Sequence, residues 1–185
     1  GLDDAGRLVF ALSPMPTPHF ESGLPPGVRS APLGAVFEVR GDGVASELCR
    51  RLAIHGGAAL IVDYGHAKPA FGDTLQAVKN HEFVGVLEAP GEADITAHVD
   101  FAALAAAARR AGLQALGPLP QGAFLRGLGI GVRAARLKAS ASPEQAARID
   151  AAVQRLTGAG RENMGELFKV LALANQALRL ESPIE

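Results

Sequence analysis

The chain has 185 residues, 48% apolar and 20% charged, and its 18 Lys and Arg against 19 Asp and Glu give a formal net charge of −1. This balance excludes a basic surface that binds nucleic acid non-specifically, and the apolar share is enough for a packed core. No apolar run approaches the roughly 20 residues that span a bilayer, and no signal-peptide pattern opens the chain. A single cysteine, Cys49, excludes an internal disulfide. We therefore expect a cytosolic or organelle-matrix protein.

The first part of the chain predicts two strands, a proline-rich loop and a helix. Residues 7–12 and 35–40 have strand-like apolar patterns. The prolines that exclude a helix or a central strand between them are Pro14, Pro16, Pro18, Pro25, Pro26 and Pro32. Gly41-Asp42-Gly43 then turns the chain into an amphipathic helix over residues 44–55, which Gly56-Gly57 ends.

The clearest element is the apolar run AALIV at residues 58–62. An uninterrupted run of this kind predicts a strand buried on both faces in a parallel sheet. We expect further helices at 101–110, 121–128, 132–138 and 143–156, and further strands at 83–87, 113–116 and 167–174. Asp100 and Ser142 are the expected N-caps of two of these helices. The strands near Ala35, Ala58 and Leu167 should share one sheet of an α/β fold, with the helices near Leu48, Leu104 and Ile149 packed around it.

Polar residues follow the predicted strand 58–62 directly. Asp63, Tyr64, Gly65 and His66 stand where ligands of α/β sheets bind, beyond the carboxyl end of a strand. The alternative is structural, with Asp63 capping a turn and the only tyrosine closing the edge of the core.

Two further clusters lie in the next forty residues or so. One is Gly72-Asp73-Thr74-Leu75-Gln76 followed by His81, in a loop long and polar enough to indicate function. The alternative is that these residues only form surface turns. The other alternates polar and apolar residues, which places its polar side chains on one face of an extended stretch. Its polar members are Asp94, Thr96, His98 and Asp100.

Other motifs predict little chemistry. The His and Asp residues from His66 to Asp100 allow a metal site, but no established metal-binding pattern is present, so we expect none. Gly127-Leu128-Gly129-Ile130-Gly131 lacks a preceding buried strand and predicts a junction between two helices. Cys49 is expected to be a small buried apolar residue.

Several blocks, in order, resemble the MidA family of class I S-adenosylmethionine-dependent methyltransferases. The blocks are GGAALIVDYGH (56–66), GDTLQAVKNH (72–81), PGEADITAHVDF (90–101), QGAFLRGLGI (121–130) and MGELFKVL (164–171). The resemblance implies a protein-arginine methyltransferase, of the type needed for assembly of respiratory complex I in mitochondria. It implies S-adenosylmethionine as cofactor, a protein substrate, and a location in the bacterial cytoplasm or the mitochondrial matrix.

The resemblance also sets expectations for the extent of the chain. The glycine-rich cofactor loop and the ribose-binding acid of this family have no match here, and the chain begins at Gly1 without Met. We expect the C-terminal part of a single, partial Rossmann-like methyltransferase domain, with residues 34–66 and 164–175 forming the sheet core and residues 67–163 a substrate-side insertion with helices. A sheet without its first strands would expose apolar surface, which favours aggregation or a homodimer.

Methyl transfer to arginine needs alignment and a carboxylate that orients the guanidinium. On the resemblance, the expected catalytic residues are Asp63, Tyr64, His98 and Asp100. The expected substrate-binding residues are Gly65, His66, Asp73, Thr74, Gln76, His81, Asp94 and Thr96. A non-catalytic protein-binding or assembly module is the main alternative, and a metal-dependent hydrolase is a further one.

Overall fold

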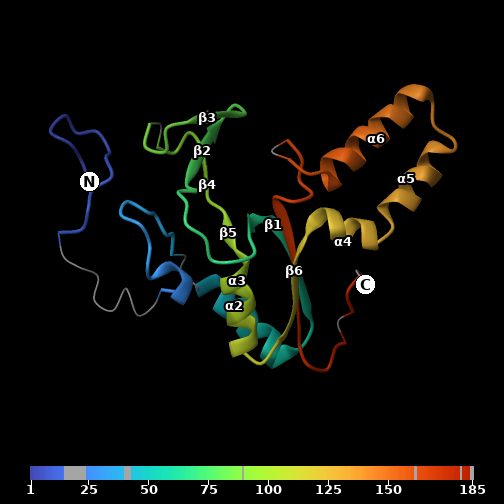
Figure 1. The fold of residues 1–185 in the computed structure, drawn as a ribbon, viewed down its shortest axis with the longest axis horizontal. Helices are drawn as coiled ribbons and strands as arrows, with labels where there is room; N and C mark the ends of the chain where they lie inside the picture. The colour runs from blue at the N-terminus through green and yellow to red at the C-terminus, as the bar shows by residue number, and fades with distance from the viewer. Residues whose placement is uncertain (15–23, 40–42, 89, 161, 180, 184–185) are drawn as a thin grey trace. The chain divides into compact units, whose positions relative to one another are not determined.

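The computed structural model describes residues 1–14, 24–39, 43–88, 90–160, 162–179 and 181–183. The elements, traced in Figure 1, are η1 (Pro26–Val28), α2 (Gly43–His55), β1 (Ala58–His66), β2 (Gln76–Lys79), β3 (Glu82–Val84), β4 (Asp94–Thr96), β5 (Val99–Asp100), α3 (Phe101–Arg110), β6 (Gln114–Pro120), α4 (Gln121–Gly127), α5 (Ile130–Lys138), α6 (Pro143–Thr157) and β7 (Phe168–Ala174). The fold is mixed α/β, as expected. The chain divides into a smaller unit, Gly1–Val39 with Pro69–His98, and a larger unit, Arg40–Lys68 with Val99–Glu185.

The larger unit contains a four-stranded sheet in the order β5-β1-β7-β6. β1 pairs antiparallel with β7 from Ala58↔Ala174 to Tyr64↔Phe168, so the prediction that these two strands share a sheet is confirmed. β1 is parallel only to the two-residue strand β5. The prediction of a parallel sheet is therefore wrong for most of this strand.

The two faces of β1 differ in burial. Ala59 and Ile61 pack against the core, whereas Leu60 is 57% exposed and Val62 is 45% exposed. Residues in a strand alternate between faces, so an apolar run is buried on both faces only if both faces are covered. The prediction of burial on both faces is wrong because helices α2 and α3 pack on one face.

The core of the larger unit lies between that face and the helices α2 and α3. Cys49 and Leu52 of α2 and Phe101 of α3 pack there with Leu171 and Leu173 of β7. Burying side chains such as Phe101 and Leu171, both 0% exposed, contributes about 1.5–3 kcal/mol each. The helices predicted near Leu48 and Leu104 thus cover the sheet as expected.

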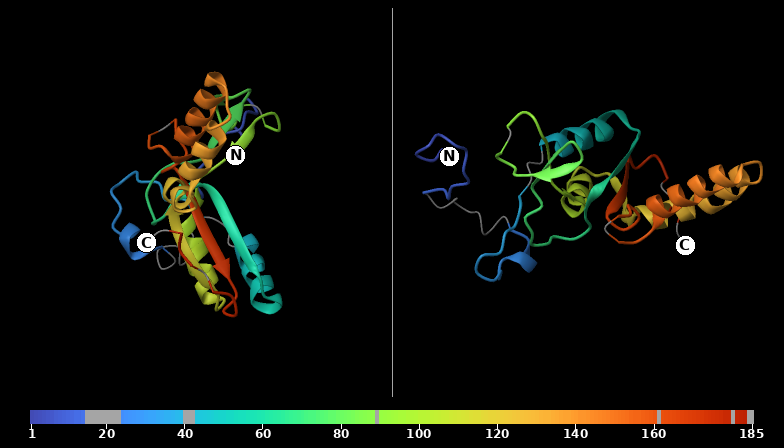
Figure 2. Two further views of the ribbon diagram at one scale, coloured as in Figure 1. Left: turned by 90° about the vertical axis from the view of Figure 1, so that its right-hand side faces the viewer. Right: turned by 90° about the horizontal axis from the view of Figure 1, so that it is seen from above.

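The last helices, α5 and α6, form a hairpin, labelled in Figure 1 and seen from two further directions in Figure 2. α6 packs against α5 and α4, and not on the sheet as predicted for the helix near Ile149. Its start was predicted correctly, because the Ser142 side chain accepts from the Gln145 N–H and Gln145 bonds back in a capping box. Gly129, with φ 83°, joins α4 to α5, which confirms the helix junction.

The smaller unit contains the three-stranded antiparallel sheet β3-β2-β4. Strands predicted at 7–12 and 35–40 do not form over residues 7–12 and 35–39. Among residues 1–14, the pairing present is the isolated bridge Leu2↔Leu8. A strand needs a partner along its length, and a local apolar pattern does not supply one. The strand predicted at 83–87 ends at Val84, where a turn begins.

Parts of two predictions concern residues that the structure does not describe. Residues 15–23 of the proline-rich loop, and Arg40, Gly41 and Asp42 at the end of the predicted strand and in the glycine turn, lie outside the described residues. None of the helices in the described part of the chain has the length and apolar composition to cross a membrane.

Candidate functional site

The predicted site residues fall into two groups, one in each unit. Five belong to the larger unit: Asp63, Tyr64, Gly65, His66 and Asp100. Seven belong to the smaller unit: Asp73, Thr74, Gln76, His81, Asp94, Thr96 and His98. Each group has its own geometry.

The first group lies at the carboxyl end of β1. The sequence places these residues after the strand, but the strand continues to His66 and contains four of them. Gly65 is buried, and its N–H donates to the Leu167 carbonyl while β5 runs along its other side (Figure 1). A Cβ at Gly65 would lie 2.1 Å from the Val99 carbonyl oxygen, so only glycine allows β5 this close.

Because β5 approaches so closely, two site residues meet that are far apart in sequence. His66 is opposite Asp100 in register, and His66 Nδ1 lies 3.9 Å from Asp100 Oδ1. His66 Nδ1 is also 2.8 Å from the Lys68 carbonyl oxygen, which only accepts, so Nδ1 carries the proton. In the neutral imidazole, the other ring nitrogen, Nε2, is then the acceptor.

Asp100 has a second, structural role. Its Oδ1 accepts from the Ala103 N–H at 2.9 Å and caps α3, as predicted. Its side chain is 14% exposed and that of His66 is 24% exposed, so both remain partly accessible.

Asp63 and Tyr64 lie on opposite faces of β1, because neighbouring strand residues alternate. The Tyr64 ring packs edge-on against Phe168, with ring centroids 5.6 Å apart. Asp63 Oδ1 accepts from the Tyr64 N–H at 2.8 Å. Lys169 is opposite Asp63 in register but bonds to the carbonyls of Glu166 and Leu167, and burial lowers the pKa of its amine.

In the smaller unit, the loop that contains Asp73 and Thr74 is held by Glu38, a residue that sequence reasoning missed. The Glu38 carboxylate accepts from the Thr74 and Leu75 N–H groups, at 3.0 and 3.1 Å, and from the Thr74 hydroxyl. Only the polar position of Glu38 in a predicted strand could have drawn attention to it, since its partners are 36 and 37 residues away.

The predicted alternating face over Asp94–Asp100 is divided between the two units. Asp94 and Thr96 are in β4, whereas Asp100 is in β5 of the other sheet. The prediction of one extended stretch is wrong, because two residues between β4 and β5 belong to neither strand and the chain changes sheets there.

The small sheet still brings three predicted residues onto one face. Gln76 is opposite Thr96, and Val78 is opposite Asp94, so Gln76, Asp94 and Thr96 share a face. His81 lies apart from them, at the exposed turn between β2 and β3, with φ 66°.

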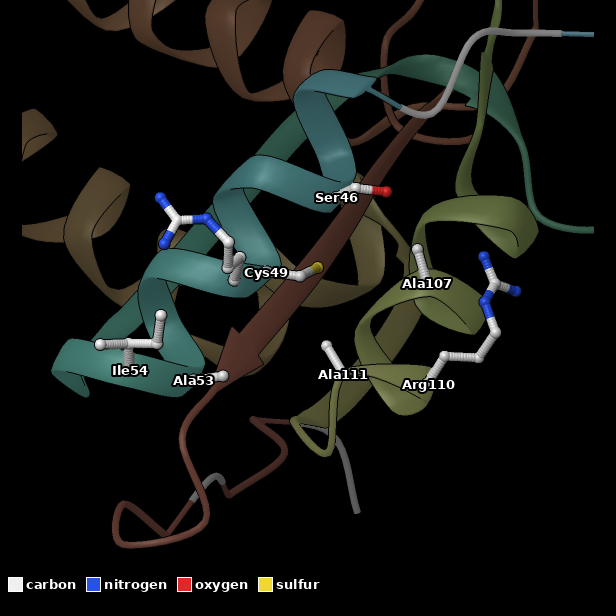
Figure 3. Close-up of a pocket in the computed structure, with 8 residues that line it drawn as sticks. Ser46, Cys49, Ala53, Ile54, Ala107, Arg110 and Ala111 are labelled. Carbon is white, nitrogen blue, oxygen red and sulfur yellow. The ribbon is translucent and has the colours of Figure 1, made fainter.

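A separate groove of about 400 Å³ runs between α2 and α3 (Figure 3). Cys49 lies in this groove between small side chains such as Ala53, Ala107 and Ala111. Burial raises the pKa of the Cys49 thiol, which is typical of an unreactive core cysteine, as predicted. The groove contains none of the predicted site residues.

Metal ligands do not gather in the described part of the chain: no group of three or more His, Cys, Asp or Glu side chains there is arranged to hold an ion. The buried side-chain N and O atoms among the described residues all have hydrogen-bond partners.

The chain resembles a protein family over most of its length. The profile of a family described as "Putative S-adenosyl-L-methionine-dependent methyltransferase" matches residues 2–119, a region that contains every predicted site residue.

Among curated proteins, two relatives illustrate the extent of the similarity. Protein arginine methyltransferase NDUFAF7, mitochondrial, from Danio rerio is 41% identical over 136 residues, which are 72% of this chain and 31% of that protein. The Drosophila melanogaster homolog is 36% identical over 171 residues, which are 90% of this chain and 37% of that protein. The chain thus spans about a third of the length of these curated relatives.

Two crystal structures from Burkholderia thailandensis have the same fold. One, bound to S-adenosyl-homocysteine, matches with a TM-score of 0.73 and 28% identity over 98% of this chain and 47% of that chain. The other, of an uncharacterized protein, matches with a TM-score of 0.74 and 29% identity over 99% of this chain and 50% of that chain.

Proposed function

The chain belongs to this family of S-adenosyl-L-methionine-dependent methyltransferases, and from that premise we propose that the protein containing it methylates arginine in a protein substrate. The observation that carries the proposal is the end of β1, where His66 and Asp100 lie together beside a glycine that has no room for a side chain, with Asp63 three residues earlier in the same strand. Carboxylates and a histidine suit the binding of a guanidinium and the removal of its proton.

We propose that the chain contributes the acceptor side of the reaction. S-adenosylmethionine supplies an electrophilic methyl group when bound. Within the described residues, no glycine-rich loop connects a strand to a helix, and Gly127–Gly131 joins two helices. We therefore assign no cofactor contact to this chain and derive its role from the acceptor residues alone.

In this proposal the acceptor is oriented by carboxylates and deprotonated by histidine. Asp63 and Asp100 each use one oxygen for a backbone N–H, so the second oxygen of each is available to a guanidinium. In the neutral form of His66, whose Nδ1 donates to the Lys68 carbonyl, Nε2 accepts the proton that the guanidinium loses. Tyr64, whose ring packs against Phe168, is proposed to form part of the acceptor wall.

We propose that the smaller unit also binds the peptide substrate. Its segment 69–98 contains five carboxylates and one lysine, a balance that suits a cationic peptide. Asp94, Thr96 and Gln76 share one sheet face, and Asp73, Thr74 and His98 come from loops joined by hydrogen bonds. His81 is retained as a substrate contact at the hairpin turn.

We further propose that the chain is the C-terminal part of a single methyltransferase domain, with sheet core residues in 34–66 and 164–175 and substrate-side elements in 67–163. Two features support this: the chain matches half or less of each solved relative, and among the described residues β1 pairs on one side only from Ala58 to Tyr64. The proposed substrate is a respiratory complex I subunit, and the proposed location is the mitochondrial matrix or the bacterial cytoplasm.

Isothermal titration with S-adenosylmethionine tests the enzyme proposal against a binding module. A binding module is favoured by the exposed apolar residues of the small sheet, Phe83 at 77% and Ile95 at 55%. We expect the cofactor to bind the natural-length protein and to bind the 185-residue chain weakly or not at all. Absence of binding to the natural-length protein would favour the module.

A further inference from the structure

Three segments of the smaller unit meet at one side chain pair, Glu38 and Thr74. One oxygen of Glu38 accepts from the N–H groups of Thr74 and Leu75, and the other accepts from the Thr74 hydroxyl. The Thr74 hydroxyl oxygen in turn accepts from the His98 N–H at 3.0 Å. Residues 38, 74 and 98 are thereby joined by hydrogen bonds in which a carboxylate is the principal acceptor.

The Thr74 hydroxyl is committed to this network. A hydroxyl has one proton, and this one is donated to Glu38. Thr74 therefore does not donate this proton to a substrate. Its contribution to the predicted binding site is to join Glu38 to the His98 backbone.

Asp73 is held on both sides by the same segment of chain. The Gly72 N–H, on one side, donates to the Val36 carbonyl at 2.9 Å. The Thr74 N–H, on the other, donates to Glu38. Hydrogen bonds thus hold the backbone on both sides of Asp73, whose side chain is exposed.

We propose that Glu38 is a positioning residue for substrate binding, which sets the location of the Asp73 carboxylate and of the His98 backbone. This inference rests on the proposed function, because the position of Asp73 affects substrate binding only if the substrate is cationic. It does not make Glu38 catalytic, since its carboxylate accepts from the Thr74 and Leu75 N–H groups and the Thr74 hydroxyl, which belong to the chain itself.

Steady-state kinetics on the natural-length protein test this role. Glu38→Gln keeps an oxygen for the two N–H groups and removes the acceptor for the Thr74 hydroxyl, so we expect about a tenfold rise in KM for an arginine peptide. The KM for S-adenosylmethionine should stay unchanged. Thr74→Val should have the same effect, Thr74→Ser should restore the wild-type value, and the double variant E38Q/T74V should be no worse than either single one.

Asp4→Asn is the matched control, because Asp4 is an exposed carboxylate of the same unit outside segment 69–98, and we expect no change in either KM. An unchanged peptide KM in E38Q overturns the proposal. Equal rises in both KM values also overturn it, because they indicate a general loss of structure.

Hydrogen exchange tests the same network without methylation. In E38Q the amides of Thr74, Leu75 and His98 should exchange at least about tenfold faster, with the amides of β1 unchanged. Unchanged protection overturns the proposal. Faster exchange throughout the chain also overturns it, because it indicates that Glu38 stabilises the whole fold and not this loop. A wild-type protein that fails to methylate any arginine peptide contradicts the proposed function, while this measurement still decides whether Glu38 positions the loop.

Discussion

Asp63 and Asp100 each accept a hydrogen bond from a backbone N–H, but only the bond to Asp100 caps a helix. Asp100 caps α3 through the Ala103 N–H, so its replacement would also weaken the helix start. Within the described part of the chain, Asp63 accepts only from the neighbouring Tyr64 N–H. Asp63 is therefore the residue at which a catalytic effect can be separated most cleanly from a structural one.

Replacing Asp63 by asparagine should lower methyl transfer by about 10²-fold or more, because the amide keeps the acceptor for the Tyr64 N–H but loses the negative charge. The rate constant kcat on an arginine peptide measures this, and thermal unfolding should be unchanged. Asp4→Asn, at an exposed site near the N-terminus, is the control. Full activity in Asp63→Asn would remove Asp63 from the site.

Cys49 links pH to stability. Burial raises its pKa above 9.0, so the folded chain keeps the thiol proton at a pH where the unfolded chain releases it. The folded state then binds more protons, and the free energy of unfolding should fall as pH rises through 9. Urea unfolding between about pH 8 and 10 checks this. Cys49→Ala should have a shallower slope, and identical slopes would contradict the buried thiol.

Among the elements, β5 depends on a single glycine. Gly65→Ala would place a Cβ 2.1 Å from the Val99 carbonyl, so β5 must move away from β1. We expect a loss of about 1–3 kcal/mol in unfolding free energy and a separation of His66 from Asp100. Gly131→Ala, in α5 with open space around it, should be neutral or slightly stabilising. A stable and fully active Gly65→Ala variant would exclude the β5 contact from the site.

Elements specified by nearby residues were predictable from the sequence. α6 begins at Pro143 because Ser142 and Gln145 form a capping box, and α3 begins beyond the Asp100 cap. The same local signals located the helix junction at Gly129.

Elements that depend on distant partners were not predictable. Residues 35–39 form no strand, although their side chains alternate, and Glu38 there bonds to a loop 36 residues away. The His66–Asp100 contact likewise requires a pairing that no local pattern specifies. The sequence therefore located the candidate residues but not the way they divide between two units.

At the scale of the whole molecule, the exposed face of β1 is the feature to explain. Leu60 and Val62 are large apolar side chains of a strand that pairs on one side there, and both are about half exposed. Apolar patches of this kind mark surfaces that other protein segments cover. We attribute this one to the remainder of a longer methyltransferase domain, and a homodimer through the same face is the alternative.

The Leu60→Thr variant tests whether the rest of a longer protein covers this face of β1. In the natural-length protein it should cost about 1.5–3 kcal/mol of unfolding free energy, because a buried leucine is lost. In the 185-residue chain as a monomer, the cost should stay within about 0.5 kcal/mol. Leu128→Thr, at a residue that is 63% exposed after α4, should cost little in both. Equal costs at Leu60 in both proteins would contradict the covered face, and a cost that depends on concentration would indicate the homodimer.

The central claim is that this chain forms the arginine-accepting side of a methyltransferase. The most direct measurement incubates the natural-length protein with isotopically labelled S-adenosylmethionine and arginine-containing substrate protein, and locates the label by mass spectrometry. The account predicts label on arginine, lost in Asp63→Asn and retained in Asp4→Asn. Label on another residue type, or none although the cofactor binds, would contradict it.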